Sequence, residues 1–325
     1  MAISSVNGFS ISGIVTVMPS NTEDNSLLTL VNTEEREHLI KHTGIRYRRI
    51  VQPNAEIKQF FCAGISQLLA NLSWQIEDID VLICVTQSPQ IDIPALACQI
   101  HGDMGLSEST LSFDINLGCS GYTYGMQATA SILASLQKKN PKAILCCGDF
   151  SSALIDKTDK ATVPIFSDAV SVTGIELDET KGRSFFNLET AGAGQKAIYA
   201  TKNIMKLNGI DVFNYSLKLV PQHVQALLSF SATPIEKIDG FIFHQANKLI
   251  NDAIGKRLGI AENKRPSTLF QYGNTASASI PLTLGVFSET NPCQHVLLCG
   301  FGVGFSVGSF ITSITQNFTY QNIEL

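Results

Sequence analysis

Residues 76–83 read Ile-Glu-Asp-Ile-Asp-Val-Leu-Ile, and residues 235–242 repeat the pattern as Ile-Glu-Lys-Ile-Asp-Gly-Phe-Ile. A second pair follows in the same order, with Ile-Leu-Cys-Cys-Gly at 144–148 and Val-Leu-Leu-Cys-Gly at 296–300. We interpret these echoes as two similar halves that face each other across a pseudo-dyad. Chance similarity between short apolar strands is the alternative. A cleft between two such halves is a natural place for an active site.

Short apolar runs alternate with stretches of helical periodicity along the chain. Strands are predicted at Phe9–Met18, Val81–Thr86, Leu111–Ile115, Ala143–Gly148, Gly240–Phe243, Val296–Gly300 and Phe305–Thr315. Helices are predicted at Ile57–Leu72, Ala95–Met104, Gly121–Gln137, Val212–Leu228, Asn247–Leu258 and Ala276–Phe287. Buried strands interleaved with helices indicate an α/β fold with largely covered sheets. We expect the first half to span residues 1–175 and the second to span 176–325.

The composition limits the possible classes of function. Apolar residues make up 44% of the 325 residues and charged residues 16%, and the net charge is −5. This balance argues against nucleic acids or anionic membranes as partners, although it leaves room for a small basic patch. The N-terminal residues lack a basic secretory region, and no apolar run reaches the ~18–20 residues of a transmembrane helix. We therefore expect a soluble, cytoplasmic protein.

The eight cysteines do not form a metal-type CxxC pair. Five of them lie inside apolar runs, namely Cys62, Cys84, Cys98, Cys146 and Cys299. Such residues are usually reduced core thiols in a cytosolic protein, so we expect neither a disulfide framework nor a metal site.

Cys119 lies in the sequence Asp114-Ile-Asn-Leu-Gly-Cys-Ser-Gly-Tyr122, between a predicted strand and a predicted helix. At the N-terminus of that helix, unpaired amides and the positive end of the helix dipole would stabilise a thiolate and lower the pKa of the thiol. Its small neighbours would let a thioester approach. A buried cysteine in a tight turn is the structural alternative.

Two further polar clusters follow apolar or glycine-rich segments. His244 begins His-Gln-Ala-Asn247 where the strand Gly240–Phe243 ends, and ligands of α/β folds bind at the carboxyl ends of strands. Asn274 follows a glycine and precedes small residues, so it is either a helix N-cap or a site residue. A lone histidine at a strand end is more often structural.

The sequence Gly-Phe-Gly-Val-Gly-Phe-Ser-Val-Gly at 300–308 looks like a dinucleotide-binding loop, but a strand rather than a helix is predicted after it. The Rossmann context is therefore absent. We interpret the segment as a glycine-rich strand connection whose amides approach a ligand.

Together these motifs resemble the β-ketoacyl-acyl-carrier-protein synthase III family of the thiolase superfamily. The resemblance covers nearly the whole chain and includes Thr43-Gly44-Ile45-x-x-Arg48 and Pro94-Ala95-x-Ala97-Cys98-Gln99-Ile100. Its most specific element is His244-Gln245-Ala246-Asn247. It implies a thiolase-like fold, in which two duplicated α/β halves form α-β-α-β-α layers.

The resemblance also implies the chemistry. Cys119 would accept an acyl group, and the amides of Cys119 and Val303 would form the oxyanion hole, although family members usually carry glycine at Val303. His244 and Asn274 would hold the carbonyl of a malonyl thioester while it loses carbon dioxide. Residues of the same motifs, Ala246, Asn247 and Phe301, would contact substrate. No cofactor is implied beyond the thioester carriers themselves.

Several positions depart from the family pattern. The residues that hold the adenine of coenzyme A correspond to His38, His42 and Lys160, so stacking and bidentate contacts are lost. Weak affinity for free coenzyme A thioesters and a preference for carrier-bound donors are therefore expected. Ile93 corresponds to the aromatic residue that in the family reaches across the dimer into the acyl pocket, and its smaller side chain favours an acyl group longer or bulkier than acetyl.

Partners are also implied by the resemblance. Lys248, Lys256 and Arg257 lie on one predicted helix and would dock an acidic acyl carrier protein, unless they are an ordinary solvated face. A homodimer is expected by analogy. The competing functions are an acyltransferase that moves the Cys119-bound acyl group to an O or N acceptor without decarboxylation, and a non-catalytic chain-length subunit, which would usually lack the cysteine.

Overall fold

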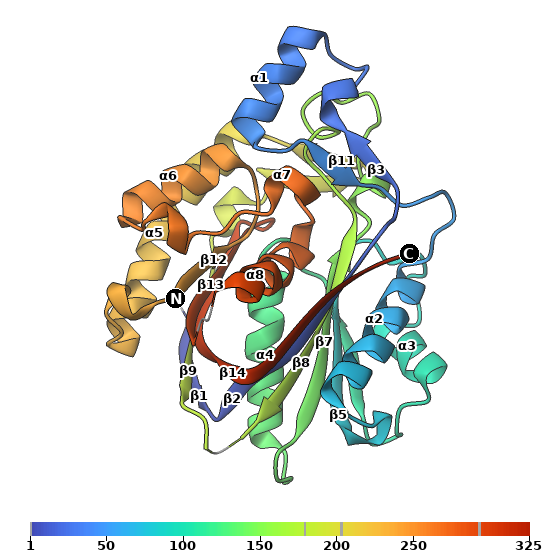
Figure 1. Ribbon diagram of the computed structural model, residues 1–325, viewed down its shortest axis with the longest axis vertical. Helices are drawn as coiled ribbons and strands as arrows, with labels where there is room; N and C mark the ends of the chain where they lie inside the picture. Colours follow the sequence, from blue (N-terminus) through green and yellow to red (C-terminus); the bar gives the residue numbers. More distant parts are fainter. Residues whose placement is uncertain (1, 179, 202–203, 292–293) are drawn as a thin grey trace.

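A computed structural model of the chain describes residues 2–178, 180–201, 204–291 and 294–325. Two sets of strands build it, and they have the same order and directions (Figure 1). The first set is β2 (Phe9–Met18), β8 (Ala169–Leu177), β7 (Lys142–Asp149), β5 (Ile79–Val85) and β6 (Leu111–Ile115). The second set is β9 (Arg183–Thr190), β14 (Ser306–Glu324), β13 (His295–Gly302) and β12 (Gly240–Phe243).

In each set two antiparallel pairings are followed by a parallel one, so that β2, β8, β7 and β5 correspond to β9, β14, β13 and β12. Both sequence echoes fall on equivalent strands. Residues 76–83 and 235–242 each form a short 3-10 turn that leads into β5 or β12, and the second echo lies in β7 and β13. The predicted duplication of α/β halves is confirmed.

The two halves are also connected through shared strands. The long β14 pairs with β9 and β13 over its first part and with β2 over its last part, and β1 (Ala2–Asn7) pairs with β9. The boundary predicted between residues 175 and 176 would cut β8, because that strand continues to Leu177. We propose that the division lies after Leu177, where every strand of the first half stays whole.

The helices form three layers around the strands (Figure 1). The layers are α2 (Ile57–Leu72) with α3 (Leu96–Met104) outside the first set, α4 (Gly121–Ser135) with α8 (Ser279–Thr290) between the two sets, and α5 (Gly209–Ser231) with α6 (Lys248–Leu258) outside the second. This is the expected α-β-α-β-α architecture. Strands β2, β5, β7, β12 and β13 are buried along almost their whole length, which explains their largely apolar sequences.

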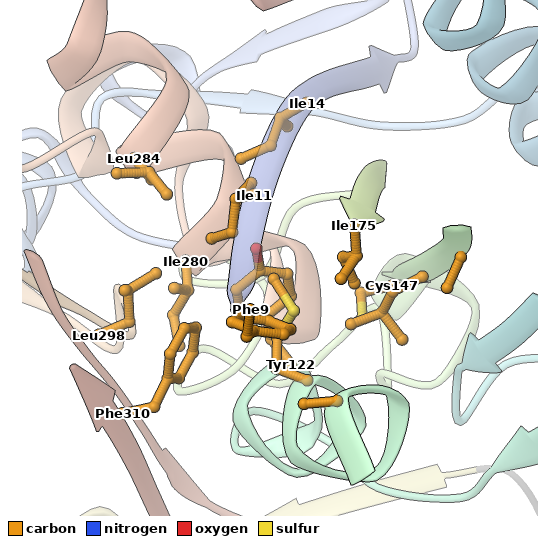
Figure 2. Close-up of a cluster of buried hydrophobic side chains, with 14 of the residues drawn as sticks. Phe9, Ile11, Ile14, Tyr122, Cys147, Ile175, Ile280, Leu284, Leu298 and Phe310 are labelled. Atoms are coloured by element: carbon orange, nitrogen blue, oxygen red, sulfur yellow. The ribbon is translucent and has the colours of Figure 1, made fainter. Parts of the chain in front are cut away.

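Figure 2 shows the core of the middle layer, where side chains of both halves meet. Tyr122 of α4 and Ile280 of α8 lie among residues of both strand sets, including Phe9 of β2 and Phe310 of β14. All four side chains are buried. Burial of each such side chain stabilises the fold by about 1.5–3 kcal/mol, so this core holds the N-termini of α4 and α8 against each other.

The sequence missed strand β1, strands β8 and β9 of the two sets, and several short or polar elements. The latter are α1 (Thr33–Thr43), β3 (Thr22–Asp24), β4 (Tyr47–Arg49), the hairpin β10 (Ile198–Thr201) and β11 (Ile204–Leu207), and α7 (Leu269–Tyr272). Helix α1 has no buried residue, so it shows no apolar stripe, but Asn32 and Glu35 form a capping box at its start.

Seven of the eight cysteines lie in the described residues, and all seven are free thiols. Cys84, Cys146 and Cys299 are buried as expected and Cys62 is half-buried, but the prediction is wrong for Cys98, which is exposed on the outer face of α3. No helix in the described ranges combines the length and the apolar character needed to cross a bilayer.

Candidate active site

The three predicted catalytic residues, Cys119, His244 and Asn274, line one cavity of about 230 Å³ between the two halves. All three are nearly buried, with 6%, 2% and 5% of their surface exposed. Val303 and the predicted substrate residues Ala246, Asn247 and Phe301 line the same cavity. The structure therefore brings together segments that lie more than a hundred residues apart in sequence.

Cys119 lies in the connection from β6 to α4, two residues before the helix begins. The amides of Cys119 itself and of Val303 both donate to its sulfur. These are the two donors expected from the sequence, and the valine side chain leaves the backbone donor in place. A Cβ atom on Gly302 would lie 3.1 Å from the Cys119 sulfur and 2.9 Å from its Cβ, so the glycine keeps the space beside the thiol open.

The expected low pKa of this thiol is wrong. Burial raises the pKa of Cys119 to about 12, the negative charge of Asp149 adds to the effect, and the two amides oppose it. Desolvation disfavours the thiolate more than the helix terminus stabilises it. The thiol is therefore protonated at neutral pH, and its proton has to leave as the sulfur reacts.

His244 directly follows the last residue of β12, and its amide donates to the Cys299 carbonyl at 2.8 Å. Burial lowers the pKa of the imidazole to about 3, so the ring is neutral and can donate from one nitrogen only. Its Nδ1 lies 2.7 Å from the Ser279 hydroxyl, which also accepts from the Gln245 amide at 3.3 Å. Either group can be the donor in the contact between the hydroxyl and Nδ1, and the Ala276 backbone also hydrogen-bonds the ring.

Asn274 precedes the 3-10 turn at the start of α8. Its Oδ1 accepts from the Ala276 amide at 2.9 Å, as in a helix cap, while Nδ2 makes one long contact of 3.4 Å to the Ala246 carbonyl. Asn274 can therefore be both a helix cap and a site residue, because the cap uses Oδ1 and leaves an N–H of Nδ2 for a ligand.

Asp149 is a cavity residue that the sequence reasoning missed. One carboxylate oxygen accepts from the Gln87 amide at 2.6 Å and from the Thr86 and Ser88 hydroxyls, and the other accepts from Ser277 at 3.1 Å. Burial raises the pKa of this carboxyl, and these donors oppose the shift. The residue therefore joins the turn after β5 to the start of α8. Its place at the end of an apolar strand was the available signal.

The outer part of the cavity is apolar. Its walls come from the β10–β11 hairpin, from α5 and α6, and from the segment after β7; the residues are Leu154, Ala161, Ile165, Phe166, Ile198, Met205, Leu207, Val212 and Ile250. Among the described residues that line the cavity, none is lysine or arginine. Such a lining suits an uncharged arm or chain rather than a phosphate.

The remaining predicted substrate residues lie away from this lining. Ile93 is 86% exposed. His38 and His42 are exposed on α1 with ring centroids 4.1 Å apart, and the Lys160 ammonium lies 4.0 Å from a Glu35 carboxylate oxygen. The chain alone does not bring these four into contact with Cys119.

The predicted docking residues differ from one another. Lys248 pairs with Asp252 one turn further along α6, so its charge is compensated. Lys256 and Arg257 are exposed in the last turn of the helix, and no ion pair to them occurs within the described ranges. Because Asn247 and Ile250 at the other end of this segment line the cavity, α6 leads from the cavity to these two cations.

Comparison with known proteins assigns the chain to a family. The family model described as 3-oxoacyl-[acyl-carrier-protein (ACP)] synthase III matches residues 113–194, and the model of the C-terminal part of the same enzymes matches residues 228–314. The two matches include Cys119 in the first and His244 with Asn274 in the second. The chain belongs to the β-ketoacyl-acyl-carrier-protein synthase III family. It is therefore an acyltransferase of the thiolase-like condensing enzymes.

Relatives of this synthase III member extend the match over most of the chain. It is 29% identical to β-ketoacyl-[acyl-carrier-protein] synthase III of Levilactobacillus brevis, over 90% of this chain and 94% of the relative, and 28% identical to that of Streptococcus mutans, over 91% and 96%. The crystal structure of a 3-oxoacyl-(acyl-carrier protein) synthase from Burkholderia xenovorans LB400 superposes with a TM-score of 0.93 at 28% identity, covering 100% of this chain and 99% of that one.

Proposed function

We propose that this enzyme loads an acyl group onto Cys119 and condenses it with a malonyl thioester, with loss of carbon dioxide. The observation that carries the proposal is the single buried cavity in which a thiol, two amides directed at its sulfur, a neutral imidazole and a carboxamide N–H meet.

In the first step the Cys119 sulfur attacks the carbonyl carbon of an acyl thioester. The negative charge that develops on the carbonyl oxygen is stabilised by the Cys119 and Val303 amides, which already point at the sulfur. The intermediate collapses to acyl-Cys119, and the departing thiolate takes up the proton that the cysteine loses.

In the second step the malonyl thioester carbonyl accepts hydrogen bonds from Nε2–H of His244 and Nδ2–H of Asn274. Loss of carbon dioxide leaves an enolate whose oxygen these two neutral donors stabilise. The enolate carbon attacks acyl-Cys119, the carbon–sulfur bond breaks, and the cysteine thiolate takes a proton from solvent. Burial keeps His244 neutral, so it acts here as a neutral donor.

A carrier-bound donor is the proposed acyl source. The position that would hold the nucleotide of coenzyme A offers Lys160, whose ammonium faces Glu35, and two histidines whose rings lie against each other at a tilt of 38°. Two exposed cations at the C-terminal end of α6, Lys256 and Arg257, are available to an acidic carrier protein.

A homodimer is proposed through the β6 edge. Within the described residues β6 pairs only with β5, and Leu111 on it is 42% exposed. The nearby loop exposes Ile91 and Ile93 at 52% and 86%. An uncovered edge flanked by apolar side chains is a natural site for pairing with a second copy, and it would bring Ile93 into a neighbouring acyl pocket.

The proposal is tested by intact-protein mass spectrometry after incubation with a panel of acyl thioesters, followed by carboxyl-labelled malonyl thioester. The expected result is one acyl mass on the parent, none on Cys119→Ala, and release of labelled carbon dioxide that depends on prior acylation. Acylation without release of carbon dioxide, with transfer to an alcohol or amine, would favour the O/N-acyltransferase instead. Turnover by Cys119→Ala at the parent rate would exclude both.

A further inference from the structure

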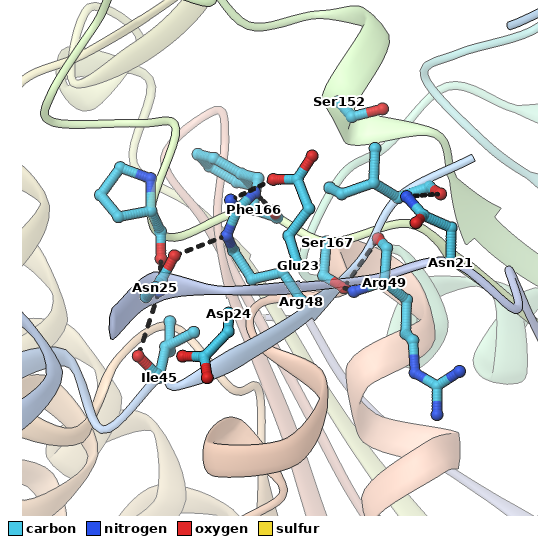
Figure 3. Close-up of polar contacts among 12 residues, drawn as sticks. Asn21, Glu23, Asp24, Asn25, Ile45, Arg48, Arg49, Ser152, Phe166 and Ser167 are labelled. Atoms are coloured by element: carbon cyan, nitrogen blue, oxygen red, sulfur yellow. Dashed lines mark hydrogen bonds and ion pairs between the residues drawn. The ribbon is translucent and has the colours of Figure 1, made fainter. Parts of the chain in front are cut away.

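Arg48 of β4 is a charged side chain that the fold buries. Its side chain is 2% exposed, and it is among the largest fully buried side chains of the described residues. Burial of a guanidinium is costly unless all its donors find partners. Its Nη2 pairs with Glu23 at 2.6 Å, its Nε donates to Asn25 Oδ1 at 2.9 Å, and its Nη1 donates to the Phe166 carbonyl at 3.4 Å (Figure 3). Two of these three contacts lead toward one segment, residues 164–167.

The 164–167 segment is held from the β4 side at several points. Asn25, which Arg48 orients, donates from Nδ2 to the Pro164 carbonyl at 2.9 Å. The Ser167 hydroxyl accepts from the Arg49 amide at 2.7 Å and donates to the Arg49 carbonyl at 3.1 Å, as Figure 3 shows. Asn25, which follows β3, and the backbone of Arg49 in β4 therefore fix one edge of this segment.

The other edge of the same segment holds Asn274. The Asn274 amide donates to the Ile165 carbonyl at 3.0 Å, and the Asn274 carbonyl accepts from the Ser167 amide at 2.9 Å. Both backbone polar groups of Asn274 are thus bound to residues 165–167. A displacement of this segment would be passed directly to the Asn274 side chain.

A second, direct contact joins Arg48 to the same place. Gly273 precedes Asn274 with a φ of 62°, and a Cβ built on it would lie 3.2 Å from Cγ of Arg48 and 3.1 Å from the Ile165 carbonyl oxygen. The aliphatic part of Arg48 therefore lies against the residue before Asn274, while its guanidinium holds the segment beside it.

We propose that Arg48 is a positioning residue for Asn274, and that it acts in condensation but not in acylation of Cys119. This assignment rests on the proposed role of Asn274 in the second step. Lysine at position 48 keeps the charge but lacks the planar fork that reaches three acceptors in three directions. A shift of the Asn274 amide by about 1 Å is expected to slow the step that uses it by up to ~10²-fold.

The test separates the two steps in Arg48→Lys. The rate of Cys119 acylation, followed by intact mass, should stay within about 3-fold of the parent, and this result also shows that the variant is folded. The rate of carbon dioxide release from labelled malonyl thioester should fall ~10–100-fold. The matched control is Arg46→Lys, which changes the neighbouring arginine, paired to Asp24 near the surface and without a contact to residues 164–167 in the described structure.

A double-mutant cycle gives the sharper result. If Arg48 acts through Asn274, Arg48→Lys should cost nothing further in an Asn274→Ala background. Equal losses in acylation and condensation, or an undiminished loss in the Asn274→Ala background, would overturn the assignment while leaving the proposed function intact. A parent enzyme that acylates Cys119 but releases no carbon dioxide would overturn the proposed function, and the assignment with it.

Discussion

Gly302→Ala is expected to block loading of Cys119 while leaving the protein folded. The new methyl would lie 3.1 Å from the Cys119 sulfur and 2.9 Å from its Cβ, against the 3.5–4.0 Å or so of an ordinary contact, so the thiol must move by about 0.5–1 Å. A displacement of that size costs ~10²-fold in rate, or about 2.7 kcal/mol of activation free energy. The φ of 151° at this position adds about 1–3 kcal/mol of strain to the folded state.

The assay is the rate of Cys119 acylation by a small acyl thioester, followed by intact mass, with unfolding measured in parallel. Gly105→Ala is the matched control, because Gly105 also has positive φ, at 66°, but a Cβ there would meet nothing within 4 Å. It should lose about 1–2 kcal/mol of stability and no acylation rate. The steric reasoning fails if Gly302→Ala acylates as fast as Gly105→Ala, or if both variants lose acylation to the same degree.

Four further outcomes are expected. The pKa of His244 is lowered from 6.5 to about 3 on folding, so the unfolded chain takes up the proton first and stability is lost as pH falls below about 6.5. Between pH 7 and 5 the free energy of unfolding of the parent, measured with urea, should fall by about 2 kcal/mol more than that of His244→Gln. Equal losses would contradict the burial argument. Ser279→Ala should lower condensation ~10-fold at unchanged acylation, since His244 loses its Nδ1 partner; Ser288→Ala on the same helix should lower neither, and the idea falls if the two variants behave alike. Ile93→Phe should shift the acyl masses found on Cys119 toward shorter chains, and an unchanged distribution would remove Ile93 from the acyl pocket. Charge reversal at Lys256 and Arg257 should raise KM for carrier-bound donors but not for small thioesters; unchanged kinetics would make them an ordinary solvated face.

Many of the main elements of the fold could be predicted because their periodicity is strong, but β8 and β9 were missed. Strands β2, β6 and β12 and helix α2 have the predicted bounds, since each is an apolar run or stripe ended by polar or turn residues. Helix α1 was missed because it buries no side chain, and the hairpin of β10 and β11 was missed because its strands are too short to show alternation.

The site was predictable as far as each residue stood at the end of a recognisable element. Cys119, His244 and Asn274 follow a strand, a strand and a glycine turn, and the duplication implied that these ends meet. Asp149 was not found although it ends strand β7, whereas Ser279 was not found because a single serine in a helix carries no signal of the group that it faces. The error on the pKa of Cys119 has the same origin: the helix terminus is visible in sequence, but the degree of burial depends on what packs over the sulfur.

The sharing of β14 between both strand sets has a consequence for synthesis on the ribosome. Residues 13–18 of β2 pair with residues 319–324, so the edge of the earlier set stays open until nearly the whole chain has been translated. Completion of this fold is therefore expected to be post-translational and cooperative, with a high contact order and slow acquisition of structure. Limited proteolysis of the native enzyme should release no independently stable fragment, since either fragment would retain an unpaired strand that belongs to the other.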